Sequence, residues 1–194
     1  FMFVDQYNAE FNRTIQPMKG GYTDNYYMQM AQNIRRYKGA RPIPVNRHIH
    51  KMSVDGSFAD WDRIDVVYRD TKGDVFHRDA KGYGGLHYKD SSGRNDIVAS
   101  KVAVGKSDIF FYAETADALT PYSDPDWMLL LIDSDGDSST GWYGYDILIN
   151  KDIASDGKGS VLRFVDGKWV KAGEYRFAVE GNKLELAVPK ALLG

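Results

Sequence analysis

Apolar and polar residues alternate with a period of two through most of the chain after Ser53. This period predicts β-strands, and short Gly-containing or polar segments separate the candidates. The candidate strands are Ile64–Arg69, Ile97–Val104, Ile109–Glu114, Trp127–Asp133, Tyr145–Asn150, Ser160–Val165, Trp169–Ala172, Tyr175–Val179 and Lys183–Val188. Asp166-Gly167, Gly173-Glu174 and Gly181-Asn182 are predicted as tight turns. The pattern favours a mainly β fold, an antiparallel β-sandwich with jelly-roll or immunoglobulin-like layers, interrupted by a long structured excursion over Thr71–Asn95.

The N-terminal part of the chain has a different pattern. Asp24–Lys38 reads as a helix with Thr23 or Asp24 at its N-cap and Gly39 as its terminator, and the apolar opening Phe1–Val4 reads as a buried strand. The Pro-containing segment Arg41–Pro44 then forms a stiff linker. We therefore expect residues 1–45 to be a strand-plus-helix remnant of a preceding β/α barrel-like domain and residues 46–194 to form the sandwich. The sequence is expected to be part of a longer protein.

Composition limits the classes of function. The chain has 25 Lys and Arg against 27 Asp and Glu, a net charge of −2, with both signs scattered along the sequence. No basic run of the kind that binds nucleic acid is present, and no apolar stretch approaches membrane-spanning length. The absence of Cys excludes disulfides, thiolate metal sites and a cysteine nucleophile. No catalytic motif stands out, so the chain itself is not expected to be an enzyme.

An acidic loop between two apolar strands is the most distinctive local feature of the sequence. Asp133, Asp135 and Asp137 lie within five residues around Gly136, between the candidate strands Trp127–Asp133 and Tyr145–Asn150. Closely spaced carboxylates on a tight loop suit a hard cation such as Ca²⁺, and Asp146 is a fourth candidate ligand. The alternative is a turn in which the Asp and Ser side chains hydrogen-bond to their own backbone.

The aromatic residues include candidate sugar contacts. Trp142 and Trp169 lie in or beside predicted turns, where indole faces are accessible for stacking on sugar rings, whereas Trp61 and Trp127 lie at strand starts and are expected in the core. The candidate sugar-binding residues are Trp142, Trp169, Tyr143 and Tyr145. A turn-flanking Trp can equally close the end of a sandwich without binding anything. His48 and His50 could share one side of an extended segment, as zinc ligands do, but no acidic partner lies near them in the sequence.

Three motifs resemble a known family. The segment Val54-Asp-Gly-Ser-Phe-Ala-Asp-Trp61 resembles the opening of family 9 carbohydrate-binding modules and their DOMON-like relatives, in which it enters the first strand. The hairpin Ile132-Asp133…Thr140-Gly141-Trp142…Ile149-Asn150 is similar to their central hairpin, and Gly181-Asn-Lys-Leu-Glu-Leu-Ala-Val-Pro189 to their late strand. The N-terminal piece resembles the junction after a glycoside-hydrolase-like barrel in Bacteroidetes-type proteins. Together, the motifs cover about residues 54–194.

The resemblance implies a non-catalytic module that binds a polysaccharide or oligosaccharide. Such a module would belong to an exported glycan-processing protein, located outside the cell, in the periplasm or at the cell surface, and would pack on its parent's catalytic-like domain. A second hypothesis is a structural accessory domain that packs on the barrel and has no ligand of its own. A third, a DOMON-like binder of haem or a redox partner, lacks a well-placed pair of axial ligands.

Overall fold

The structure is a computed structural model that describes residues 25–39, 48–73, 78–81, 87–155 and 157–194. The chain divides into two units, Phe1–Asn46 and Arg47–Gly194. The expected strand Phe1–Val4, the N-cap candidates Thr23 and Asp24 and the linker Arg41–Pro44 lie outside the described residues. The interpretation of residues 1–45 as a barrel remnant stays a prediction. Among the residues described, no helix combines the length and apolar character that crossing a membrane requires.

The first unit contributes one described element, the helix α1 (Asn25–Lys38), which confirms the predicted helix. Met30, Ala31 and Ile34 are half-buried, whereas most of the other described side chains are exposed. Gly39 follows with φ of 75°, in the left-handed region where glycine ends helices without strain. The helix therefore ends where the sequence predicts.

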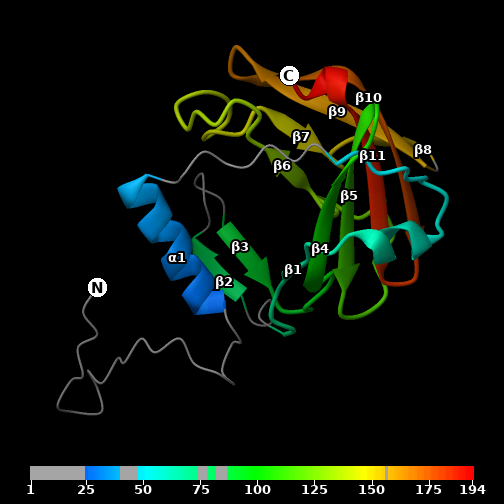
Figure 1. Ribbon diagram of the computed structural model, residues 1–194, viewed down its shortest axis with the longest axis horizontal. Coiled ribbons are helices and arrows are strands. Elements are labelled where there is room, and N and C mark those ends of the chain that lie inside the picture. The colour runs from blue at the N-terminus through cyan, green and yellow to red at the C-terminus, as the bar shows by residue number, and fades with distance from the viewer. Residues whose placement is uncertain (1–24, 40–47, 74–77, 82–86, 156) are drawn as a thin grey trace. The chain divides into compact units, whose positions relative to one another are not determined.

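The second unit is built on one curled antiparallel sheet (Figure 1). Its strands follow the order β1-β4-β5-β11-β10-β9-β7-β6, and β8 pairs with β9 in addition. The strands are β1 (Tyr68–Arg69), β4 (Ile97–Val104), β5 (Asp108–Thr115), β6 (Leu130–Ile132), β7 (Ile147–Ile149), β8 (Ile153–Ser155), β9 (Lys158–Val165), β10 (Lys168–Glu180) and β11 (Lys183–Pro189). The predicted mainly β, antiparallel fold is confirmed.

The part of the sequence between β1 and β4 forms a small separate sheet. It pairs β2 (Arg78–Lys81) with β3 (His87–Asp90) in antiparallel register. Both strands lie within the stretch Thr71–Asn95, which the sequence predicts as a structured excursion. The periodicity did not resolve them, because polar and glycine residues dominate this stretch.

One predicted turn is wrong. Asp166-Gly167 and Gly181-Asn182 do connect β9 to β10 and β10 to β11, but Gly173-Glu174 lies inside β10, at a β-bulge in its pairing with β9. A Cβ on Gly173 would lie 2.5 Å from Cδ1 of Leu192, so the glycine permits a close side-chain approach instead of a turn. A glycine can mark either a turn or a close approach within a strand, and here it marks the second. The two predicted strands Trp169–Ala172 and Tyr175–Val179 are therefore one continuous strand, β10.

The predicted strand Ile64–Arg69 is also largely wrong. Phe58–Arg63 forms a 3₁₀ helix, η1, and only Tyr68–Arg69 pairs with β4. Ile64 is buried and its backbone N–H bonds to the carbonyl of Trp61, which closes the 3₁₀ turn. Residues 65–67 form neither helix nor strand, and Val66 is 62% exposed, so Ile64 packs into the core as the residue that ends η1.

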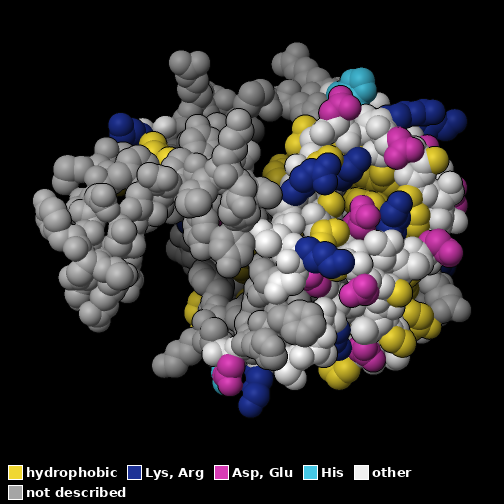
Figure 2. All heavy atoms as spheres, turned by 90° about the horizontal axis from the view of Figure 1, so that it is seen from below, with side chains coloured by type: hydrophobic (Ala, Val, Ile, Leu, Met, Phe, Trp, Pro, Cys, Tyr) yellow, Lys and Arg dark blue, Asp and Glu magenta, His cyan; other side chains and the backbone are white. Residues whose placement is uncertain are grey.

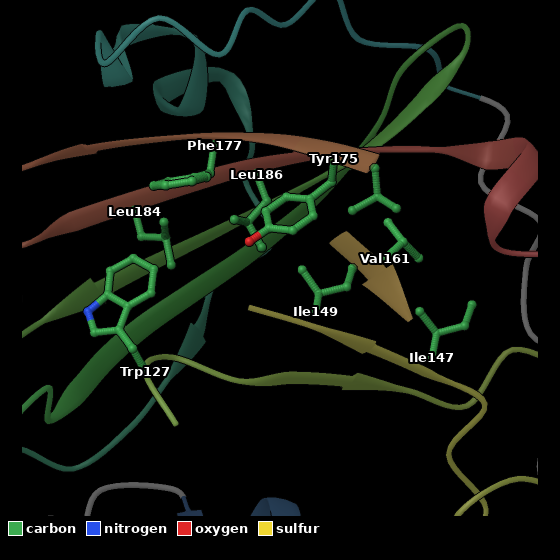
Figure 3. Close-up of a cluster of buried hydrophobic side chains, with 9 residues drawn as sticks. Trp127, Ile147, Ile149, Val161, Tyr175, Phe177, Leu184 and Leu186 are labelled. Atoms are coloured by element: carbon green, nitrogen blue, oxygen red, sulfur yellow. The ribbon is translucent and has the colours of Figure 1, made fainter. Parts of the chain in front are cut away.

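The main core lies on the concave side of the curled sheet. Figure 3 shows the side chains of Phe177, Leu184 and Leu186, from β10 and β11, pointing toward Trp127 and Ile149. All five are buried. Trp127 is in the core as the sequence predicts, and its indole N–H donates to the carbonyl oxygen of Thr120 at 2.8 Å. This core includes side chains of β6 and β7, the two strands that flank the acidic loop.

A second apolar layer covers the opposite face of β4, β5 and β11. We call residues Met52–Ile64 the covering segment. Its Phe58 and Trp61 rings contact Tyr112 with centroid distances of 5.8 and 5.2 Å, and all three join Ala187 in a compact cluster. Strand β11 is therefore buried on both faces, which explains the nearly continuous apolar sequence Leu184–Val188.

Candidate functional site

An aromatic cluster forms where the β6–β7 loop meets the β9–β10 hairpin. The rings of Trp142 and Trp169 lie with centroids 6.4 Å apart, and Trp142 also contacts Tyr143 edge-on at 5.2 Å. Trp169 packs in turn against Phe164 at 5.1 Å. Tyr143 is 53% exposed, whereas both indoles are half-buried. The structure thus brings together three of the predicted sugar-binding residues, from two separate segments.

The turn that presents Trp142 is tightly constrained. The backbone N–H of Trp142 donates to the carbonyl of Tyr145 at 2.7 Å, and the return bond from Tyr145 to Trp142 measures 3.1 Å. Gly141 has φ of 63°, and a Cβ there would overlap the carbonyl oxygen of Tyr145. Tyr143, at φ of 53°, is also in the left-handed region, and its side chain is exposed. Tyr145, a predicted sugar contact, is half-buried in this turn.

The carboxylates of the acidic loop bond mainly to the loop itself. Asp133 accepts the backbone N–H of Gly136 at 2.6 Å. Asp135 accepts the N–H of Asp137 at 2.8 Å and the hydroxyl of Thr140 at 2.9 Å. These bonds are the Asx-type contacts expected of a turn that stabilises its own backbone. They account for the sequence of the loop without any bound ion.

Three of the four predicted metal ligands nevertheless converge. Asp133, Asp135 and Asp146 each offer a carboxylate oxygen, and these oxygens lie within 4.8 Å of one another. Asp146 is almost fully buried, and its Oδ2 accepts both the N–H and the hydroxyl of Ser134, at 2.8 and 3.0 Å. Oxygens bound to one Ca²⁺ are at most about 5 Å apart, so the spacing fits that ion.

Asp137 lies outside this group. Its Oδ1 accepts the hydroxyl of Ser139 at 2.6 Å and the N–H of the same residue at 2.9 Å. The hydroxyl bond and the backbone bond, in that order, hold the pKa of Asp137 below its usual value, because both favour the ionised form. Asp137 therefore stabilises the turn at Ser139 and does not belong to the group of Asp133, Asp135 and Asp146.

The two remaining Trp residues and the two neighbouring His residues do not form a site in the described structure. Trp61 and Trp127 are buried, as predicted. The rings of His48 and His50 contact each other edge-on at 4.4 Å, but the single group of three or more possible metal ligands among the described residues does not include them. No metal site at these histidines is supported by the described geometry.

Sequence reasoning missed a buried carboxylate on β11. Glu185 is 0% exposed, and its Oε1 accepts the backbone N–H groups of Asp55 and Gly56 at 3.0 and 2.9 Å. Its Oε2 accepts the indole N–H of Trp61 at 2.9 Å. Glu185 thus fixes both ends of the motif Val54–Trp61 to the sheet. The available signal was one acidic residue inside an otherwise apolar strand.

The face of the molecule in Figure 2 mixes Lys and Arg with Asp, Glu and apolar side chains. A mixed face of this kind lacks the single-sign basic field that binds nucleic acid. The chain matches no family model, no curated protein and no solved structure.

Proposed function

We propose that the second unit is a non-catalytic carbohydrate-binding module whose sugar contacts are Trp142, Tyr143 and Trp169. The observation that supports it is the contact between Trp142 and Trp169, residues that lie on different hairpins, beside an exposed Tyr143. Aromatic rings grouped at a loop-rich end of a rigid sheet provide stacking faces, and hydroxyls and carboxylates of the adjacent loop provide hydrogen bonds to a sugar. From the motif resemblance, we propose that such a module belongs to an exported glycan-processing protein.

Such a surface binds weakly. A sugar that covers about half of a ~200 Å² ring gains about 2–3 kcal/mol at ~25 cal/mol/Å². Because association costs offset much of this gain, one or two rings give dissociation constants of about 1 mM. Affinity gel electrophoresis through polysaccharides and NMR titration with oligosaccharides detect binding in this range.

Replacing Tyr143 or Trp169 by Ala is expected to reduce retention on a polysaccharide gel that retards the unaltered protein. The free energy of unfolding should change by less than about 1 kcal/mol for Tyr143→Ala, because this side chain is more than half exposed. Tyr68→Ala is the matched control, since Tyr68 is an exposed Tyr at 61% on β1, outside the cluster. Its retention should equal that of the unaltered protein.

The contrary results favour the second hypothesis. If no polysaccharide retards the protein, or if Tyr143→Ala and Trp169→Ala are retained as well as Tyr68→Ala, the aromatic cluster only closes the end of the sheet. The unit is then a structural accessory domain that packs on a neighbouring domain and has no ligand of its own.

We further propose that Ca²⁺ binds to the converging carboxylates of Asp133, Asp135 and Asp146 and stabilises the loop beside the sugar contacts. At a Ca²⁺ concentration of 100 times Kd, binding adds about 2.7 kcal/mol to the free energy of unfolding. For a domain of this size, that raises Tm by about 5–10 °C. Scanning calorimetry with added Ca²⁺ and then with a chelator measures the effect.

Two variants make the calcium test specific. Asp133→Asn should abolish the rise in Tm, because it removes one of the three converging carboxylates. Asp137→Asn should keep it, since Asp137 lies outside the group and bonds to Ser139. If Ca²⁺ and chelator leave Tm unchanged in the unaltered protein, the loop is a self-bonded turn and the metal proposal is wrong.

A further inference from the structure

An apolar pocket lies where the curled sheet does not close. It has a volume of about 480 Å³, with Phe111, Leu184 and Leu186 among its lining residues on β5 and β11. Val102 on β4 forms part of one side, and the whole segment Met128–Asp133 forms the other. Val102 is 44% exposed although it lies beside the main core. The sheet therefore leaves apolar surface uncovered among the described residues.

The segment on the β6 side presents its backbone edge to this pocket. Alternate residues of a strand point to opposite faces, yet all six consecutive residues of Met128–Asp133 line the pocket. Among the described residues, β6 pairs only with β7 and is the last strand of the sheet (Figure 1). The carbonyl of Ile132 accepts the N–H of Asp146, so the backbone groups of Ile132 face β7. Those of Leu131 then face the pocket.

The surroundings of this edge are acidic. Residues 107–150 contain nine Asp and Glu and no Lys, Arg or His. Two of these acids are paired with cations from elsewhere in the chain, Asp124 with Arg94 and Asp126 with Lys151. Asp133, which lines the pocket, and the adjacent Asp135 form no ion pair with any described residue. Lys101 also lines the pocket, but its Nζ donates to the carbonyl oxygen of Trp61 at 2.8 Å, in the covering segment on the other face of the sheet. A ligand at this edge therefore meets apolar side chains, an open strand edge and the negative charge of the acidic loop together.

We propose that this pocket, which we call the β6 groove, binds an extended segment of a partner protein that adds to β6 as an antiparallel strand. The segment has apolar residues at alternate positions, which fill the pocket, and Lys or Arg just before them. In antiparallel pairing, the residues that precede the strand lie opposite Asp133 and Asp135. A small apolar ligand would leave the Leu131 backbone groups unpaired. A second copy of this chain would bring two acidic loops together, because each β6 is followed by one.

The test is a selection from a random peptide library displayed on phage, with the 194-residue chain as bait and chelator in the buffer. Enriched peptides are synthesised and titrated by fluorescence polarisation. We expect them to alternate apolar and polar residues after one or more Lys or Arg, and to lose affinity when those cations become Gln or when salt is raised. The dependence on salt measures the contribution of the acidic loop.

Three variants locate the binding site. Val102→Glu, which places a charge in the groove, and Leu131→Pro, which removes the N–H at the free edge, should each weaken peptide binding by about tenfold or more. Val165→Glu is the matched control, since Val165 is 45% exposed, outside the groove, and should bind normally. Circular dichroism checks that each variant folds, and Val102→Glu alone suffices if Leu131→Pro does not fold.

Several results would overturn the proposal. These are a selection that enriches nothing, peptides without the alternating and basic pattern, or binding that Val102→Glu does not weaken. Self-association of the unaltered chain that Val102→Glu abolishes, measured by analytical ultracentrifugation, would assign the groove to a second copy instead. The variants lie outside the aromatic cluster and chelator is present, so failure here leaves the proposed sugar and calcium binding untouched, and the reverse also holds.

Discussion

Glu185→Ala is expected to lower the free energy of unfolding by about 3 kcal/mol, the largest effect of any single polar side chain among the described residues. The substitution leaves three N–H donors without their acceptor, those of Asp55, Gly56 and the Trp61 indole. Bonds to a charged group are worth about 1.5–3 kcal/mol each, and an unsatisfied buried donor costs about 1–3 kcal/mol. The sum is reduced because the variant no longer buries a carboxylate away from water. Urea denaturation measures the change.

Two further variants separate the hydrogen bonds from the side-chain volume. Glu185→Gln keeps one oxygen for the two backbone amides but turns an NH₂ group toward the indole N–H of Trp61, so we expect a loss of about 2 kcal/mol. Glu180→Ala, at an exposed position of β10, should change stability by less than about 0.5 kcal/mol. Hydrogen exchange at the amides of Asp55 and Gly56 should accelerate in Glu185→Ala. If Glu185→Ala lowers the free energy of unfolding by less than about 1 kcal/mol, the apolar contacts alone hold the covering segment on the sheet.

Much of the sheet was predictable because local physics determines it. Ile97–Val104 and Lys183–Val188 are short, mainly apolar runs, the first followed by Gly105 and the second preceded by the Gly181-Asn182 turn, and the strands observed there agree with the predicted bounds to within a residue. The Asp166-Gly167 turn was predictable because both residues adopt positive φ, at 50° and 78°, as a type I′ hairpin requires. These features depend on residues that are neighbours in the sequence.

The features that sequence reasoning missed depend on distant residues. Glu185 reads as an ordinary strand residue, and its partners precede it by more than 120 positions. The contact of Trp142 with Trp169 depends on the path of the β6–β7 loop and on where β10 begins, which no local pattern specifies. The grouping of Asp133 and Asp135 with Asp146, and not with Asp137, likewise follows from the return of the hairpin.

The second large effect is expected at Gly159, which lies on β9 beneath the ring of Tyr175. Gly159→Ala should lower the free energy of unfolding by about 3 kcal/mol, because the new Cβ would overlap the hydroxyl oxygen of Tyr175 and would lie only 2.5 Å from Cε1 and Cζ of the ring. The ring is 1% exposed, and burial raises the pKa of its hydroxyl above the usual value. The hydroxyl donates to Oδ1 of Asn150, whose amide donates to the carbonyl of Met128, so moving the ring away from Gly159 would disturb these two hydrogen bonds.

A double-mutant cycle tests this steric account. Gly159→Ala combined with Tyr175→Leu should cost about 2 kcal/mol less than the sum of the two single variants, because the shorter side chain vacates the overlapping atoms. Combined with Tyr175→Phe it should show a smaller relief, since the overlap with the hydroxyl oxygen is removed but Cε1 and Cζ remain 2.5 Å from the new Cβ. If Phe relieves Gly159→Ala as well as Leu does, the hydroxyl and its bond to Asn150 determine the packing. If Gly159→Ala alone lowers the free energy of unfolding by less than about 1 kcal/mol, β9 can move away from the Tyr175 ring. The packing of this part of the core is then less constrained than the contacts indicate.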